Sequence, residues 1–491
     1  MSCGEGGGGC LGRGVCNLIY IWTVSSFLVF ITFLSSLLNG KNKTIRETED
    51  GKRKRTIAFF HPYCNAGGGG ERVLWAALRS LQQSSSAKTP DHFIIYTGDV
   101  GASPSDILSK ARNNFNIIIS PTNVEFIFLS RRNWVESSPF PIFTLLGQSL
   151  GSIYLGLEAF SSFVPDVFID TMGYAFTLPL FKYLGNSRVA AYVHYPTIST
   201  DMLSRVAQRD LSYNNQGMVA NSATLSSAKL IYYRVFAWIY SWAGRKSEVT
   251  MVNSSWTEGH ILQLWRKPET TFKVYPPCDV RAFKELVRHD EDQEKRSINI
   301  VSVAQFRPEK DHQLQIKAMK ELKEMVEPEV WQRLRLVLLG SVRNEGDQER
   351  VDGLKELSRD LGVEKNCVFQ VNFSFDTLKK ELVDGLLGIH TMWNEHFGIS
   401  VVECMAAGLL MVANKSGGPL MDIVVDDEEG DRNGFLAQDE HEYARVIKNI
   451  LGMSPDLQER IRKRARSSVD RFSDQEFETN FRKALEIILK T

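Results

Sequence analysis

Short apolar runs rich in β-branched and aromatic residues alternate with helical patterns along most of the chain. A first series of runs lies at 56–60, 93–96, 124–129, 167–170, 189–193 and 249–252. A second series lies at 298–303, 334–339, 367–371, 386–390 and 409–412. Strands that alternate with helices form parallel sheets with helices on both faces. The pattern therefore predicts an α/β protein with two doubly wound, Rossmann-like domains in tandem.

The length of 491 residues fits this division, because a single hydrophobic core stops growing at about 250–300 residues. We assign an N-terminal domain to 56–288 and a C-terminal domain to 297–470. The charge-rich stretch 289–296 is the expected hinge. We expect 471–491 to form a helix that packs back on the N-terminal domain. Sheets of this kind bind ligands beyond the carboxyl ends of their strands, so the cleft between the domains is the expected site.

The charges of the chain balance, with 58 lysines and arginines against 58 aspartates and glutamates. Binding to nucleic acid requires a basic surface that neutralises phosphates, so this balance argues against a nucleic-acid partner. The seven cysteines are scattered and form no C-x-x-C pair. This spacing indicates free thiols in a reducing compartment and gives no sign of a metal site.

The N-terminal region contains an uncharged apolar segment at 18–38. As a helix, its 21 residues would extend about 31 Å, enough to cross a bilayer. A cleaved signal peptide is the alternative, but the apolar stretch is long for one. Seven basic residues follow the segment in the linker 39–55, whereas the tail 1–17 contains one, Arg13. The positive-inside rule then predicts a single-pass anchor with a short lumenal tail and a cytosolic body.

A second apolar and aromatic segment lies at 228–244 and includes only two charged residues, Lys229 and Arg234. It is too short to span a membrane comfortably. It could form a buried core helix, or a helix that lies at the membrane interface with its tyrosines and tryptophans at headgroup depth. The sequence leaves both interpretations open.

A glycine tetrad follows the first predicted strand and precedes a helical pattern. Glycines at such a place allow a ligand to approach the backbone amides and the helix N-terminus, and phosphate is the usual ligand. The stretch lacks the G-x-x-x-x-G-K-[ST] pattern of an ATP-hydrolysing loop, and a plain tight turn is the alternative. We interpret it as a phosphate or acceptor loop formed by Gly67, Gly68, Gly69 and Gly70.

Two carboxylates lie close together around the start of a predicted helix in the C-terminal half. Glu395 belongs to the loop after an apolar strand, and Glu403 lies about one turn into the helix. Between them, Phe397, Gly398, Ile399 and Ser400 would present backbone amides suited to a diphosphate. Apolar residues flank both carboxylates, which therefore need hydrogen-bond partners such as sugar hydroxyls.

The sequence E-H-F-G-I-S-V-V-E-C-M-A-A-G at 395–408 resembles the E-x7-E signature of the retaining glycosyltransferase family 4. The resemblance extends from about residue 56 to the C-terminus and implies the GT-B fold. It implies that Glu395 contacts hydroxyls of the donor sugar and that Glu403 holds the ribose of the donor nucleotide. It further implies that Lys310 neutralises the donor diphosphate.

Further positions follow from the same resemblance. His194 is expected to face the transferred sugar, and Gly417 and Gly418 to form a turn near the donor phosphates. The family usually has an arginine where this chain has Gln305, and Arg307 is our candidate replacement. The acidic triplet at 290–292 lies in the charged hinge, and we interpret it as a solvated charge run. The resemblance implies no cofactor and no metal requirement.

Within the family, the stretches 61–66, 147–149, 193–197 and 392–396 resemble the mannosyltransferases that extend dolichol-diphosphate oligosaccharides. This implies GDP-mannose as donor and Man3GlcNAc2-diphosphodolichol as acceptor, which would receive its fourth and fifth mannoses in α-1,2 linkage. It also implies the cytosolic face of the endoplasmic reticulum membrane, with other mannosyltransferases of that face as candidate partners. A sugar-nucleotide epimerase and a non-catalytic subunit of a lipid-linked-oligosaccharide complex are the alternatives.

Overall fold

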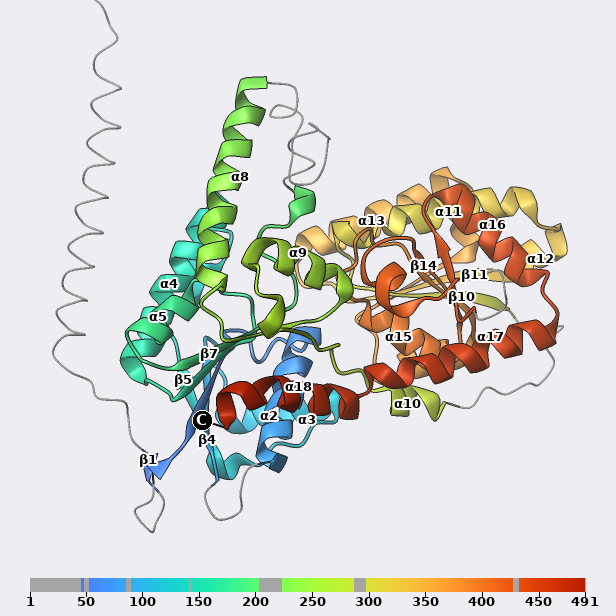
Figure 1. Ribbon diagram of the computed structural model, residues 1–491. Helices are drawn as coiled ribbons and strands as arrows, with labels where there is room; N and C mark the ends of the chain where they lie inside the picture. Colours follow the sequence, from blue (N-terminus) through green and yellow to red (C-terminus); the bar gives the residue numbers. More distant parts are fainter. Residues whose placement is uncertain are drawn as a thin grey trace, which may run out of the picture.

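The computed structural model describes residues 46–47, 53–84, 90–140, 143–202, 223–286, 297–426 and 432–490. It contains two α/β lobes that lie side by side (Figure 1). No helix within these ranges is both long and apolar enough to cross a membrane. The predicted tail 1–17, span 18–38 and hinge 289–296 lie outside them, as does most of the predicted linker 39–55. In that linker, the short strands β1 (Arg46–Glu47) and β2 (Arg53–Lys54) pair with each other.

The N-terminal lobe is built on a parallel sheet of seven strands in the order β5-β4-β3-β6-β7-β8-β9. The strands are β3 (Thr56–Phe60), β4 (His92–Thr97), β5 (Val124–Phe128), β6 (Val167–Asp170), β7 (Arg188–Val193), β8 (Val249–Val252) and β9 (Thr271–Lys273). The connecting helices are α2 (Gly69–Ser84), α3 (Pro104–Phe115), α4 (Thr144–Ser162), α5 (Thr177–Tyr183), α8 (Ala223–Gly244) and α9 (Ser255–Trp265). Six of the seven strands correspond to the predicted runs, and β9 was not predicted.

The C-terminal lobe has a parallel sheet of six strands in the order β12-β11-β10-β13-β14-β15. The strands are β10 (Ile298–Val303), β11 (Leu334–Gly340), β12 (Cys367–Val371), β13 (Gly385–His390), β14 (Leu410–Asn414) and β15 (Phe435–Ala437). The helices are α11 (His312–Met325), α12 (Pro328–Arg333), α13 (Glu345–Asp360), α14 (Phe375–Asp384), α15 (Ile399–Ala406), α16 (Glu440–Leu451) and α17 (Pro455–Ser468). The prediction of two doubly wound domains is confirmed.

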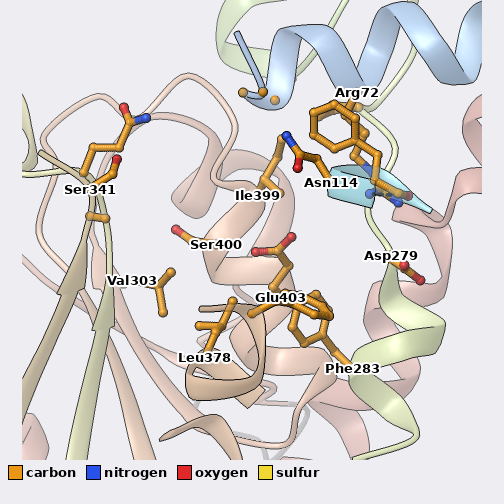
Figure 2. A pocket seen from close by; sticks show the side chains of 18 of the residues that line it. Arg72, Asn114, Asp279, Phe283, Val303, Ser341, Leu378, Ile399, Ser400 and Glu403 are labelled. Carbon is orange, nitrogen blue, oxygen red and sulfur yellow. Dashed lines mark hydrogen bonds between the residues drawn. The ribbon is translucent and has the colours of Figure 1, made fainter. Parts of the chain in front are cut away.

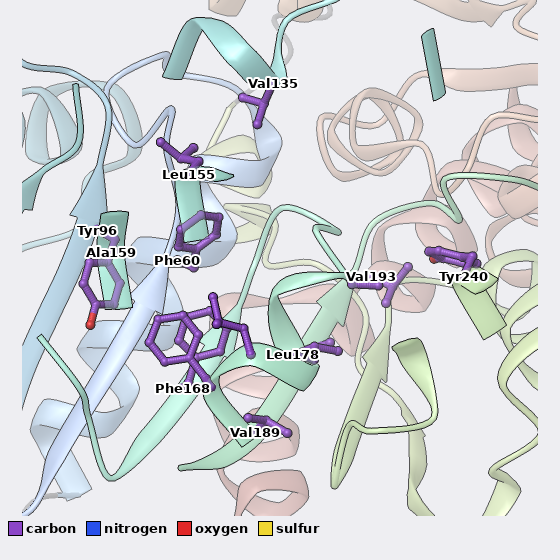
Figure 3. Close-up of a cluster of buried hydrophobic side chains, with 14 of the residues drawn as sticks. Phe60, Tyr96, Val135, Leu155, Ala159, Phe168, Leu178, Val189, Val193 and Tyr240 are labelled. Carbon is purple, nitrogen blue, oxygen red and sulfur yellow. The ribbon is translucent and has the colours of Figure 1, made fainter. Parts of the chain in front are cut away.

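The N-terminal sheet is buried on both faces, as its apolar strands require. On one face, Phe60, Tyr96 and Phe168 pack under α4, α5 and α8 (Figure 3). The rings of Phe168 and Phe181 stack with centroids 3.8 Å apart. The opposite face is covered by α2, α3 and the last helix, α18 (Asp474–Leu489).

The chain returns to the N-terminal lobe through α18, which lies beside α2 (Figure 1). Phe477 and Phe481 are buried in the core of that lobe. Arg72 forms an ion pair with Asp474, at 2.9 Å between Nη2 and Oδ1. The chain crosses to the C-terminal lobe after β9 and crosses back before α18. These two crossings touch, since the Cys278 N–H donates to the Phe472 carbonyl at 2.9 Å. The helix predicted at 471–491 is thus α18, and it packs on the N-terminal lobe.

The strand order places a topological switch point in each sheet, between β3 and β6 and between β10 and β13. The connections leave opposite ways at such a point, which opens a crevice beyond the carboxyl ends of the strands. The residues that follow β3, β7, β10 and β13 line one common cleft between the lobes.

Candidate active site

The cleft has a volume of about 1320 Å³ and is lined by both lobes and by the crossing between them (Figure 2). The crossing after β9 contributes Asp279, which directly precedes the short helix α10 (Val280–Lys284), and Phe283, which lies within it. Most of the predicted site residues line this one cleft, namely Gly67, Gly68, Gly69, Gly70, His194, Arg307, Lys310, Glu395, Phe397, Gly398, Ile399, Ser400 and Glu403.

Lys310 and Glu395 form an ion pair at the switch point of the C-terminal sheet. Lys310 ends a short 3-10 turn after β10, and its Nζ lies 2.5 Å from Glu395 Oε2. His390, the last residue of β13, brings its Nε2 to 3.1 Å from the same oxygen. Burial alone would raise the pKa of Glu395, but Lys310 and His390 outweigh it and hold this pKa well below its ordinary value. Glu395 is therefore an ionised acceptor close to a fixed cation.

Gly417 and Gly418 are not among the residues that line the cleft. They lie against the loop that carries Glu395, whose carbonyl accepts the Gly418 N–H at 2.7 Å. A Cβ on Gly418 would come within 2.5 Å of the Phe397 carbonyl oxygen, and one on Gly417 within 2.3 Å of the Glu395 carbonyl oxygen. In this structure the two glycines let their own backbone pack closely against the loop that carries Glu395. They do not line the cleft in which the donor phosphates were expected.

Glu403 projects from α15 into the cleft (Figure 2). Within the described parts of the chain, its carboxylate has no hydrogen-bond partner. Burial raises the pKa of Glu403 to about 7, against the opposing effect of nearby Arg72. A buried carboxylate of this kind is stabilised by ligand hydroxyls that donate to it.

The N-terminus of α15 lies between the two carboxylates. Gly398 precedes the helix with φ of 111°, a left-handed conformation that favours glycine. No side chain of the described residues caps this helix end. The first N–H groups of a helix lack intrahelical acceptors, so those of Ile399 and Ser400 are placed to bind an anion in the cleft.

A buried polar network holds the glycine loop on the opposite wall. Glu71 accepts a hydrogen bond from the Gly68 N–H, and its Oε1 lies 3.3 Å from His61 Nε2. His61 Nδ1 lies 2.8 Å from Thr171 Oγ1. This network holds the loop on its buried side, and Gly67–Gly70 line the cleft on the other side.

His194 joins this network through Thr171, whose carbonyl lies 3.0 Å from His194 Nε2. A carbonyl can only accept, so Nε2 donates and the ring is protonated there. Burial, with His61 nearby, lowers the pKa of His194 to about 4. His194 is thus a neutral imidazole near pH 7, with Nδ1 left as an acceptor for a hydroxyl group.

The sequence interpretation did not include Glu71, Arg72 or Asp279. Arg72 donates to the Pro277 carbonyl at 3.0 Å and to Asp474, and its side chain also lines the cleft near Glu403. Glu71 and Arg72 directly follow the glycine tetrad at the start of α2, and this position next to the predicted loop is the sequence signal that could have identified them as site residues. Arg307 lines the cleft as a further cation, with its side chain 33% exposed.

Two family models match the sequence, "ALG11 mannosyltransferase N-terminus" over residues 54–265 and "Glycosyl transferases group 1" over residues 283–468. A human GDP-Man:Man(3)GlcNAc(2)-PP-Dol alpha-1,2-mannosyltransferase is 52% identical over 97% of this chain and 94% of its own length. The Dictyostelium discoideum protein of the same name is 46% identical over 88% of this chain and 85% of its own length. This chain belongs to that family of mannosyltransferases. Membership favours a glycosyltransferase over the epimerase and the non-catalytic subunit.

Solved structures show the same fold at low sequence identity. A glycosyltransferase from Rickettsia africae aligns with a TM-score of 0.59 and 17% identity over 89% of this chain and all of its own. Anabaena Alr3699/HepE in complex with UDP and glucose aligns with a TM-score of 0.58 and 18% identity, covering 88% of this chain and 99% of its own. The two lobes therefore have the GT-B arrangement of glycosyltransferases.

The packing of Gly418 predicts that Gly418→Ala lowers the rate of mannosyl transfer by about tenfold or more, because the new Cβ must displace the backbone that carries Glu395. Gly259→Ala is the matched control, since among the described residues no atom beyond α9's own backbone and the glycine's chain neighbours lies within 4 Å of its added Cβ. Initial rates, together with thermal melting of each variant, test this. Full activity of the folded Gly418→Ala variant would contradict the proposed role of the glycine.

Proposed function

We propose that this protein transfers mannose from GDP-mannose, in α-1,2 linkage, to the dolichol-diphosphate oligosaccharide Man3GlcNAc2. It would add the fourth and fifth mannoses in the pathway of protein N-glycosylation. The observation that carries the proposal is the high identity to relatives of this name over nearly the whole chain. The charges of the cleft fit the donor, with cations and helix amides for a diphosphate and two carboxylates for hydroxyl groups.

The donor would lie along the cleft with each part facing a different group. Glu403 would accept hydrogen bonds from the ribose, which offsets the cost of burying its carboxylate. Lys310, the first amides of α15 and the glycine loop would surround the diphosphate, with Arg307 as a further cation. Glu395 would accept from hydroxyls of the mannose, and the free Nδ1 of His194 could accept another from the N-terminal side.

The reaction would retain the configuration at the mannose. The bond between C1 and the β-phosphate oxygen breaks, and the 2-hydroxyl oxygen of the acceptor mannose forms a bond to C1 on the same face. The hydroxyl proton passes to the departing phosphate oxygen. Lys310 and the α15 amides stabilise the charge that develops on GDP, so electrostatics contributes most of the catalysis. We propose that this cationic environment serves in place of a metal.

A transfer assay tests the proposed function. The purified full-length protein is incubated in detergent with GDP-mannose and Man3GlcNAc2-diphosphodolichol, with and without EDTA. We expect two successive mannose additions, both released by an α-1,2-specific mannosidase, at rates unaffected by EDTA. Absence of transfer to this acceptor would contradict the proposed function, and loss of transfer in EDTA would contradict the proposed metal-independent mechanism.

We also propose that the protein is anchored by 18–38 in the endoplasmic reticulum membrane, with its body on the cytosolic side and α8 against the bilayer. One face of α8 is buried in the core through Tyr233, Phe236 and Tyr240. The other face carries Ile231, Val235, Trp238 and Trp242, which are 45–68% exposed and spaced as a helical stripe.

Helix α4 extends the same apolar surface. Phe143, directly before α4, packs against Tyr232 of α8 at 5.2 Å between ring centroids, and the Tyr232 hydroxyl accepts the Leu146 N–H at 3.1 Å. Leu146 and Leu150 are exposed. Lys246 lies 5.2 Å from the ring of Trp242, where its charge could meet lipid phosphates. The buried face of α8 fits the interpretation of 228–244 as a core helix, and the exposed apolar face supports our proposal that the same helix lies at the membrane interface.

This surface predicts a defect that depends on the bilayer. In Trp238→Ala/Trp242→Ala, the KM for acceptor embedded in vesicles should rise by about tenfold, whereas the KM for a short water-soluble acceptor should be unchanged, because only the first acceptor requires apposition to lipid. Ile118→Ala, which removes an exposed apolar side chain elsewhere on the lobe, is the control. Equal KM changes for both acceptors would contradict membrane contact through α8.

A further inference from the structure

The loop that carries Glu395 is held by both lobes. On the C-terminal side, the Asn394 N–H donates to Ser416 Oγ at 2.7 Å and the Gly418 N–H donates to the Glu395 carbonyl at 2.7 Å. On the N-terminal side, the Asn394 side-chain amide donates to Asp201 Oδ2 at 2.8 Å. The loop therefore spans the boundary between the lobes.

His396 forms the second contact of this loop with the N-terminal lobe. Its ring stacks on Tyr195, which follows β7, with centroids 5.0 Å apart and planes 19° apart. Trp256 of α9 also contacts the His396 ring, at 5.0 Å and 31°. One ring of the C-terminal lobe thus packs against two rings of the N-terminal lobe, an arrangement that requires the lobes to be close together.

Trp256 is itself held within the N-terminal lobe. The rings of His260 and Trp256 meet in a T-shaped arrangement, with centroids 4.3 Å apart. His260 Nδ1 is 2.6 Å from Thr200 Oγ1, and its Nε2 is 3.6 Å from Asp201 Oδ2. The same aspartate receives the hydrogen bond from Asn394. The ring stack and the polar contact are therefore parts of one network on the N-terminal side.

His396 connects this network to the carboxylate of its neighbour. Its main-chain N–H donates to Glu395 Oε1 at 3.1 Å, while Lys310 and His390 contact the other oxygen, Oε2. A displacement of His396 would remove the donor to Oε1 and leave the carboxylate held on one side only. The ring contacts of His396 and its main-chain hydrogen bond to Glu395 therefore belong to the same residue, so the packing of the ring bears on one of the three contacts that hold the carboxylate.

We propose that Tyr195 and Trp256 are positioning residues for mannosyl transfer, which clamp His396 across the lobe boundary and so orient Glu395 only when the lobes are together. This inference rests on the proposed function, in which Glu395 contacts the transferred sugar. The clamp does not include Glu403 or the α15 amides, which belong to the C-terminal lobe alone. Its loss should lower turnover and leave nucleotide binding intact.

Steady-state kinetics of Tyr195 variants test the clamp. Tyr195 is 55% exposed, so its truncation creates no buried cavity. We expect Tyr195→Ala to lower kcat by about tenfold or more, with KM for GDP-mannose, Kd for GDP and Tm close to wild type. Tyr195→Phe keeps the ring and should retain kcat. An unchanged kcat in Tyr195→Ala, or an equal loss in Tyr195→Phe, would contradict the proposal.

A double-mutant cycle separates the clamp from direct contact of Tyr195 with substrate. His396→Ala removes the ring but keeps the main-chain N–H, and it should lower kcat at least as much as Tyr195→Ala, because it also removes the contact with Trp256. Tyr195→Ala/His396→Ala should be no slower than the slower single variant, because the two residues act through one contact. Multiplied losses would show independent roles and overturn the clamp. If Tyr195→Ala fails to fold, Tyr195→Leu takes its place in both experiments.

These results are distinguishable from failure of the proposed function. If the wild-type protein transfers no mannose, the function itself is wrong and the clamp is wrong with it as a device for mannosyl transfer. If the wild-type protein transfers mannose and the variants depart from the expected pattern, only the clamp is wrong.

Discussion

The ion pair between Lys310 and Glu395 is the interaction on which the site depends. The two side chains follow neighbouring strands, β10 and β13, at the switch point of the C-terminal sheet, and meet at 2.5 Å. The pair lets a carboxylate remain ionised inside the cleft, where burial would otherwise favour its neutral form. It also sets a cation beside the place where a donor diphosphate would lie. In the proposed function, this one contact would provide both the carboxylate that binds the sugar and part of the phosphate site.

Each lobe contributes different groups to the cleft around this ion pair. The C-terminal lobe supplies Glu403 and the open N-terminus of α15, while the N-terminal lobe supplies the glycine loop and the neutral His194. Helix α18 returns the chain from the C-terminal lobe to the N-terminal lobe, where the ion pair between Arg72 and Asp474 fastens it to α2. The rings around His396 connect the lobes at the loop of Glu395. The proposed chemistry therefore requires both lobes, although most of the residues proposed to bind GDP-mannose belong to the C-terminal lobe.

Much of the fold could be predicted from sequence, because buried parallel strands are continuous apolar runs bounded by turns. The three-residue strands β9 and β15 were missed, since such short runs carry no periodic signal. The lining role of Glu395, Glu403 and Lys310 followed from motifs. The contacts of Arg72 with Asp474, 402 positions away, and the packing of Gly418 under the Glu395 loop could not be predicted. They depend on tertiary neighbours that no local pattern reveals.

In the proposed function Glu395 and Glu403 would contact different parts of one donor, and steady-state kinetics of their alanine variants separates the two roles. Glu403→Ala should chiefly raise KM for GDP-mannose, because its contact with the ribose is made equally in the ground and transition states. Glu395→Ala should lower kcat even at saturating donor, because its contact with the mannose strengthens as the bond to GDP breaks. Identical changes of kcat and KM in the two variants would contradict this account.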